Sequence, residues 1–241
     1  MKLRGAALTL AFAGIVAWSP LTMPGSAFQN KPPQVAIPQP GVPQIMTLEG
    51  AFVRAAYNNE GYAILGYKLV NLSVGEEWML LEVGVALRDG VSDYSLTRES
   101  FSLETPDGKT TPLATVEEYR KVNLSAMEQR EKVQRDSINY FPPMATRACR
   151  IGFFAELSSR AMSWDEVELS YQRACLGRLY FPIPEGITYG QHWLNVQFDK
   201  SLIRVPFRIL TKEEETMLSK NYKAISKQVE EAFKPPKKKK D

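Results

Sequence analysis

EWMLLEVGVALRDGVSDYSLTRESFSLETPDG, residues 77–108, contains two runs in which apolar and polar side chains alternate. In the first run every second residue is apolar: Met79, Leu81, Val83, Val85 and Leu87. Because a strand points successive side chains to opposite faces, this spacing predicts one buried face. Positions 80, 82, 84, 86 and 88 fall on the other face.

The second run places Phe101 and Leu103 on one face and ends in a turn sequence, TPDG, at 105–108. Proline presets the backbone for such a turn, and Gly108 accepts a positive φ. Asp89 and Gly90 interrupt the chain between the two runs. The stretch therefore predicts an antiparallel sheet with one covered face.

Further alternating runs lie on both sides of this stretch. They predict strands over 47–57, 62–71, 151–157, 167–171, 179–183, 192–198 and 203–209. Short strands separated by turn signals are typical of a β-sandwich, which we expect to occupy 46–210.

One segment inside this domain has a different character. Thr115 and Glu118 fit a capping box, and residues 125–136 are charged and favour a helix. The pattern predicts a helical insert over about 115–137, with its charged face in solvent.

A final helix is predicted from 211 to 233, with Thr211 and Glu214 as a second capping box. Apolar residues recur in it at helical spacing and include Leu218, Tyr222, Ile225 and Val229. Such a stripe either packs on the sandwich or forms a surface for a partner helix, in which case an envelope protein is the expected partner. The lysine-rich end, 234–241, is expected to be disordered.

The chain begins like a secretory signal peptide, residues 1–27. Lys2 and Arg4 precede an apolar core of about fourteen residues, and small residues at 25–27 resemble a cleavage site. That core is shorter than the roughly 20 residues that span a bilayer, which favours cleavage after Ala27 over a retained anchor. We therefore expect a periplasmic or extracellular protein with no transmembrane segment after cleavage.

Residues 28–45 contain five prolines and predict an extended, semi-rigid spacer. The alternative interpretation is a peptide ligand for an aromatic groove.

The formal net charge of +3 comes from the ends of the chain. Loss of Lys2 and Arg4 with the signal leaves +1, and five lysines and one aspartate give the tail +4. The body, 28–233, therefore carries about −3 and does not favour nucleic-acid binding. The tail by itself predicts a weak, salt-dependent contact with an anionic surface.

Cys149 and Cys175 are the two cysteines of the chain. An even number in an exported protein predicts a disulfide, and two buried free thiols are the alternative.

Chemical motifs are scarce. The sequence contains no glycine-rich phosphate loop, nucleophile elbow or zinc-protease motif, so we predict no catalytic, cofactor or metal residues. The single histidine, His192, shares an apolar face with Leu194 and is interpreted as a packing residue. Tyr180 and Trp193 could form an aromatic platform for a carbohydrate or another polymer. A hydrolase would need two acids facing each other in a cleft, with one pKa raised.

Three segments carry a resemblance: WMLLEVGVAL (78–87), FSLETPDGKTTPL (101–113) and LGRLYFPIPEG (176–186). They are similar to immunoglobulin-like extracytoplasmic β-sandwiches of bacteria, a largely uncharacterised family. The resemblance spans roughly 46–210, while the helical insert and the last helix depart from it. It implies an exported, non-enzymatic binding or scaffolding module. It implies no functional residues.

Overall fold

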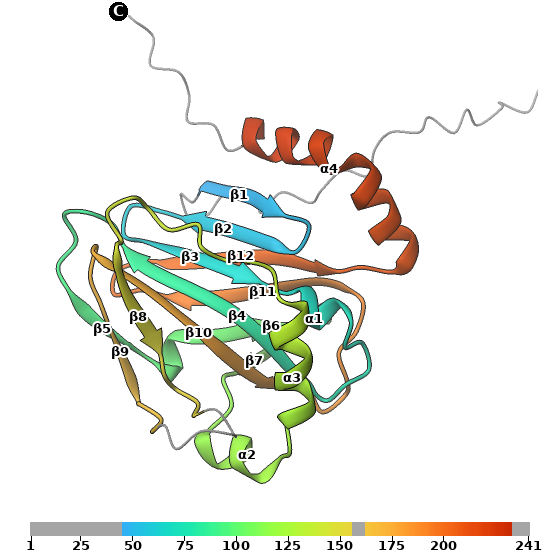
Figure 1. Cartoon of the computed structure of the whole chain (residues 1–241), viewed down its shortest axis with the longest axis horizontal. Coiled ribbons are helices and arrows are strands. Elements are labelled where there is room, and N and C mark those ends of the chain that lie inside the picture. Colours follow the sequence, from blue (N-terminus) through green and yellow to red (C-terminus); the bar gives the residue numbers. More distant parts are fainter. Residues whose placement is uncertain (1–44, 156–161, 233–241) are drawn as a thin grey trace, which may run out of the picture. The chain divides into compact units, whose positions relative to one another are not determined.

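The computed structural model describes residues 45–155 and 162–232, which are mainly β (Figure 1). The expected signal peptide, nearly all of the proline-rich spacer and the lysine tail lie outside the described residues. Ten strands form two larger sheets, and two further strands form a small one. Among the described strands all neighbours are antiparallel, except the parallel pair β8 and β10.

The larger sheet has six strands. Its order is β1 (Ile45–Gly50), β2 (Val53–Tyr57), β3 (Gly61–Gly66), β4 (Trp78–Leu87), β10 (Arg173–Pro182) and β8 (Arg147–Ile151). The second sheet has the order β12 (Leu202–Ile209), β11 (Gly190–Gln197), β6 (Phe101–Glu104) and β7 (Thr110–Pro112). The small sheet pairs β5 (Tyr94–Thr97) with β9 (Glu166–Leu169).

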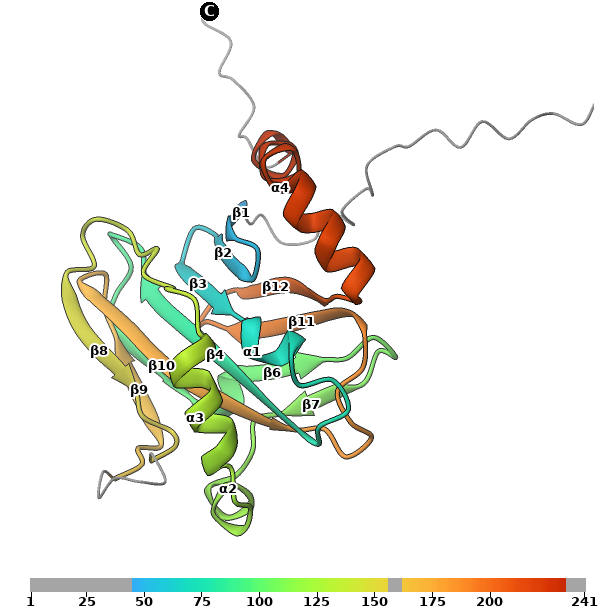
Figure 2. The ribbon, with the colours of Figure 1, turned by 45° about the vertical axis from the view of Figure 1, so that its right-hand side comes forward.

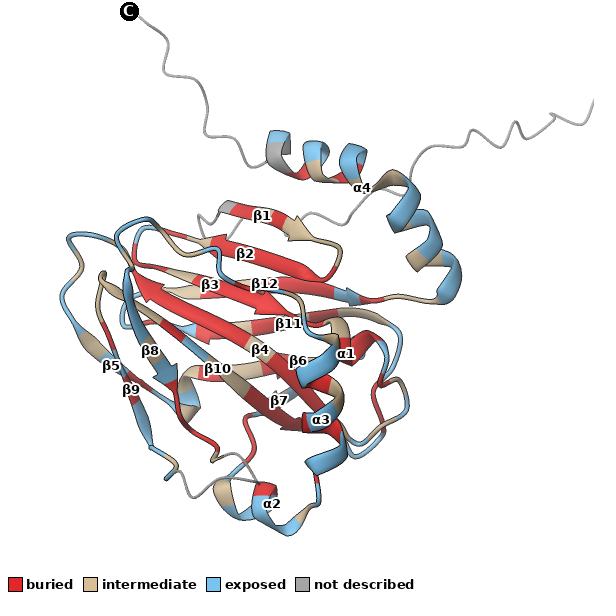
Figure 3. Ribbon diagram, viewed as in Figure 1, coloured by how far each residue is buried: buried red, intermediate tan, exposed pale blue. Residues whose placement is uncertain are grey.

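One hydrophobic core joins the two larger sheets, as in a β-sandwich (Figure 3). β4 contributes its predicted face, Met79 through Leu87 at alternate positions, and all five side chains are fully buried. β6 adds Phe101 and Leu103 from the other sheet. The turn after β6 also forms as predicted, with Gly108 N donating to Thr105 O at 2.9 Å and φ of 80° at Gly108.

The helices are α1 (Lys68–Asn71), α2 (Val116–Lys121), α3 (Ser125–Gln134) and α4 (Lys212–Ala232), and a 3-10 turn spans Arg98–Ser100. The structure confirms both predicted capping boxes. Glu118 N donates to Thr115 Oγ1 and Glu214 N to Thr211 Oγ1, and each glutamate accepts the threonine N–H in return.

Four predicted strand boundaries were wrong, and one of them is the start of β10, which begins at Arg173 and not at 179. The 47–57 run is divided by a turn at 51–52, where Arg54 Nη1 donates to the carbonyls of Gly50 and Ala51. The 62–71 run ends at Gly66 and continues as α1. β8 already ends at Ile151, because the chain turns there to bury Phe153 in the core. Alternation by itself does not reveal such turns.

The prediction that β4 has one covered face was also wrong. Leu80 and Ala86 are at most 2% exposed on its outer face, because α3 and the segment 135–141 cross that face (Figures 1 and 2). Two glycines permit the close approach. A Cβ on Gly66 would meet Ile138 at 2.7 Å, and one on Gly84 would meet the Phe141 ring at 2.7 Å. The outer face of this sheet is therefore a second packing layer.

Candidate functional site

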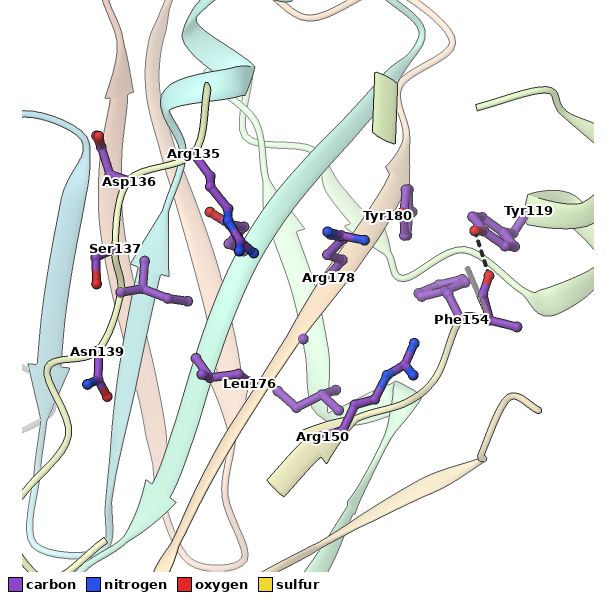
Figure 4. A pocket seen from close by; sticks show the side chains of 15 residues that line it. Tyr119, Arg135, Asp136, Ser137, Asn139, Arg150, Phe154, Leu176, Arg178 and Tyr180 are labelled. Atoms are coloured by element: carbon purple, nitrogen blue, oxygen red, sulfur yellow. Dashed lines mark hydrogen bonds and ion pairs between the residues drawn. The ribbon is translucent and has the colours of Figure 1, made fainter. Parts of the chain in front are cut away.

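A pocket of about 470 Å³ lies on this outer layer, between the end of α3 and the edge strand β8 (Figure 4). We call it the arginine pocket, because guanidinium groups from three different segments line it. The lining residues are Glu82, Tyr119, Arg135, Asp136, Ser137, Ile138, Asn139, Arg150, Ile151, Phe154, Ala155, Leu176, Gly177, Arg178 and Tyr180. Its volume is in the range of small-molecule sites.

The base of the pocket is a buried ion pair. Arg178 on β10 lies 2.6 Å from Glu131 on α3 (Nη2 to Oε2), and the Glu131 side chain is 1% exposed. Arg135 follows α3 directly and contacts Glu131 at 3.8 Å and Glu82 at 3.7 Å. These contacts fasten α3 to the sheet and place two guanidinium groups at the pocket.

Glu82 projects from the outer face of β4 beside this pair, and its side chain is 13% exposed. Burial and the neighbouring Glu131 carboxyl raise the pKa of Glu82 from 4.5 to about 8, although Arg135 and Arg178 oppose the shift. Two like charges in one buried site repel each other, so one of the two carboxyls keeps its proton. Glu82 is therefore a neutral acid over most of the neutral pH range.

One end of the pocket is aromatic. Tyr119, Phe154 and Tyr180 contact one another, with ring centroids 4.8–5.0 Å apart. The hydroxyls of Tyr119 and Tyr180 lie 2.7 and 3.0 Å from Oε1 of Glu128, a buried residue of α3. Burial raises the pKa of both tyrosines, so they are neutral donors toward this carboxylate.

Arg150 enters the pocket from β8, on the side away from Arg135. Figure 4 shows it extending from β8 toward Phe154. β8 is an edge strand, and the adjacent Cys149 ties it to Cys175 on β10. The disulfide thereby fixes the strand that carries Arg150.

That disulfide is confirmed. Cys149 and Cys175 are directly paired across the parallel strands, and their Cα atoms are 4.1 Å apart. Cys175 is fully buried.

The structure does not bring Tyr180 and Trp193 together. Tyr180 is on β10 and 2% exposed, because α2 and α3 cover the face on which we expected it to be accessible. Trp193 is half-buried on β11, in the other sheet, with the Arg204 guanidinium 4.7 Å from its ring centroid. They form no common platform, and Tyr180 belongs instead to the wall of the arginine pocket.

The apolar stripe of α4 lies against its own domain (Figure 3). Ile225 and Val229 are at most 4% exposed, while Leu218 and Tyr222 are half-buried against the core. The Tyr222 hydroxyl donates to Leu48 O on β1 at 3.2 Å. The first of the two predicted arrangements, packing on the sandwich, therefore accounts for this stripe.

Sequence reasoning missed the buried acids beside the pocket. It assigned the charged face of the insert to solvent, whereas Glu128 and Glu131 are at most 3% exposed. A usable signal was present in β4, where Glu82 and Gly84 interrupt a strand that is otherwise almost entirely apolar. The carboxyl of Glu82 and the absence of a side chain at Gly84 favour the packing of another segment against the outer face of the strand.

His192 is buried, stacks on Phe207 and places Nδ1 3.1 Å from Gly190 O, in the sheet opposite the pocket. In the described part of the chain, His, Cys, Asp and Glu side chains form no group of three that could hold a metal ion. Within 45–155 and 162–232, no helix combines the length and the apolar character that crossing a bilayer needs.

A second hollow, of about 540 Å³, lies among the loops at 58–60, 90–94 and 199–201. Its buried acid, Glu60, accepts hydrogen bonds from Ser201 Oγ at 2.6 Å, Tyr94 Oη at 3.0 Å and Lys200 N at 3.0 Å. Because these bonds join the loops to one another, we interpret Glu60 as a residue that stabilises the loops. The arginine pocket is therefore the better candidate site.

Comparison of the chain with protein-family models, with curated proteins and with solved structures finds no match.

Proposed function

We propose that the protein is an exported, non-enzymatic β-sandwich of the immunoglobulin-like kind, which binds a ligand of the cell envelope in the arginine pocket. The N-terminal signal sequence and the disulfide support export. The observation that carries the binding role is the pocket itself, in which guanidinium groups and an aromatic wall converge on a rigid sheet.

Binding explains the geometry better than catalysis does. Glu131 is fully buried and held by Arg178, so it cannot touch a substrate. His192 is 1% exposed and lies in the other sheet. A ligand in the pocket would instead contact two positively charged side chains near its mouth, Arg135 and Arg150, next to apolar surface.

The test is to incubate the purified exported protein with the small-molecule fraction of an envelope extract and to identify retained compounds by mass spectrometry. The test variant is Arg150→Ala. Its matched control is Arg147→Ala, since Arg147 is an exposed arginine on the same strand that does not line the pocket. We expect a retained compound that is lost with Arg150→Ala and kept with Arg147→Ala. Equal retention by all three proteins, or none by any, would contradict the proposal.

One observation favours a second function, a hydrolase. Glu82 combines partial access with a pKa raised to about 8, next to a second carboxyl, and it could act as a general acid. This function would require Glu82 alone to reach the substrate. Hydrolysis of ester, glycoside or peptide substrates that disappears in Glu82→Gln would establish it and overturn the non-enzymatic proposal.

A further inference from the structure

We propose that the arginine pocket takes a single carboxylate group carried on an apolar body. The carboxylate lies between Arg135 and Arg150, and the apolar body lies against Phe154, Ile151 and Leu176. This inference rests on the binding function proposed above and names the class of ligand.

Two of the three guanidinium groups retain donors for an anion. Arg135 reaches carboxylates only at 3.7 and 3.8 Å, too far for a hydrogen bond, and it is half exposed. Arg150 is exposed and makes no ion pair within the described residues. Each guanidinium offers five N–H donors in a planar fork that matches a carboxylate. Figure 4 shows the two guanidinium groups on either side of Arg178, so an anion in the space between them would draw both side chains toward it.

Charge in the pocket favours one negative charge over two. Glu131 and Glu128 lie buried beside it, and α3 ends at Gln134, so the negative end of its dipole is directed at the lining segment 135–139. With Glu82 neutral and Arg178 paired with Glu131, Arg135 and Arg150 carry +2 and the Glu128 carboxylate carries −1, so a monoanion balances the remaining charge of +1. A phosphate dianion would be repelled more strongly by the buried carboxylates and by the negative end of the helix dipole.

The remaining lining selects an apolar body. Leu176 is 36% exposed at the pocket although it is a large apolar residue, and Ile151 and Phe154 continue this surface inward. The Phe154 ring is held edge-on to Tyr180 at 5.0 Å, so the wall is rigid. An aryl or alkyl group covering Leu176 would gain the free energy of apolar burial.

A carboxylate on an apolar body has two sources, a small organic acid or the C-terminus of a peptide that ends in an apolar residue. The two share their chemistry at the pocket and differ in what lies outside it. Separate probes distinguish them.

The experiment is isothermal titration of the full exported protein with phenylacetate, phenylacetamide, phenyl phosphate, acetate and a tetrapeptide ending in phenylalanine, free or amidated at its C-terminus. We expect phenylacetate or the free-acid peptide to bind at least tenfold more tightly than its amide counterpart, and phenylacetate to bind more tightly than phenyl phosphate and acetate. Arg150→Ala should weaken binding at least tenfold, and Arg147→Ala should leave it unchanged.

Arg150 is exposed, so its replacement should preserve the fold, which the thermal midpoint verifies. Arg135→Ala serves as a second variant with the same expected loss. Equal affinity for acid and amide, or tighter binding of phenyl phosphate, would overturn the carboxylate assignment. If no probe binds while Arg150-dependent retention from extract persists, the ligand class is wrong and the binding function stands. If both experiments fail, both proposals fall.

Discussion

Glu131 and Arg178 form an ion pair between α3 and β10, with Oε2 and Nη2 2.6 Å apart and side chains 1% and 17% exposed. The pair joins a helix that is far from β10 in sequence to the outer face of the main sheet. A buried pair of this kind contributes little net stability as a pair, yet it makes each member dependent on the other.

Removing one member should destabilise the protein strongly. Arg178→Met leaves the Glu131 carboxylate buried without its main counter-charge, and we expect the free energy of unfolding to fall by about 3–5 kcal/mol. The double variant Arg178→Met/Glu131→Met should recover most of this loss. Urea unfolding measures both. A single variant as stable as the wild type would show that the pair does not hold α3. As a control, Glu185→Gln at the exposed Lys109–Glu185 pair should leave stability unchanged.

Glu82 should make stability fall as the pH rises. Its pKa is about 8 in the folded protein against 4.5 normally, so between these values the folded state holds a proton that the unfolded state releases. The stabilising contribution is complete below about pH 4.5 and is lost progressively up to about pH 8. Compared with Glu82→Gln, the wild type should lose free energy of unfolding between pH 5 and 8. Above pH 8 the two curves of unfolding free energy against pH should run parallel. Parallel curves throughout would contradict the assignment.

His192 should make stability fall as the pH falls. Burial lowers its pKa below 6.5, so the unfolded chain binds a proton that the folded protein resists. Stability that is complete above about pH 6.5 is lost as the pH falls through the lowered folded value. Because the chain has one histidine, its imidazole titration can be followed directly by NMR. A pKa at or above 6.5 would refute the prediction, and His192→Phe should remove this part of the acid sensitivity.

The Cys149–Cys175 disulfide should stabilise the fold and hold Arg150 in place. It links residues 26 apart in sequence, for which loop-closure entropy gives about 3.5 kcal/mol. Reduction should lower the free energy of unfolding by that order and weaken any Arg150-dependent binding. Denaturant unfolding with and without dithiothreitol, with thiol alkylation to quantify reduction, tests this. Equal stability of the two forms would mean that the sheet alone fixes β8.

Much of the fold could be predicted because local patterns specify it. Alternation marked the buried face of β4, and capping boxes located the starts of α2 and α4. Turn chemistry marked the ends of β4 and β6. Each of these signals depends on neighbours a few residues apart, where backbone geometry decides which side chains meet. The turn at 51–52 lacked such a signal and was missed.

The pocket was beyond this reasoning, because its parts come from distant positions. Glu82 and Arg178 belong to paired strands separated by almost a hundred residues, Glu131 to an inserted helix and Arg150 to an edge strand. A charged helical face is most often solvated, so Glu128 and Glu131 carried no sign of burial. Their burial follows from the close approach of the 135–141 segment, which Gly66 and Gly84 permit.

The sequence by itself determined the β-rich class, the helical insert, the amphipathic last helix and the cysteine pair, since period, caps and composition are local properties. Only the tertiary structure decided that the outer face of β4 is covered, that the α4 stripe packs on β1, and that three arginines and Glu82 line one pocket beside the buried Glu128 and Glu131. Sheet order and helix docking make those choices, because they minimise exposed apolar surface and unpaired buried charge over the whole domain.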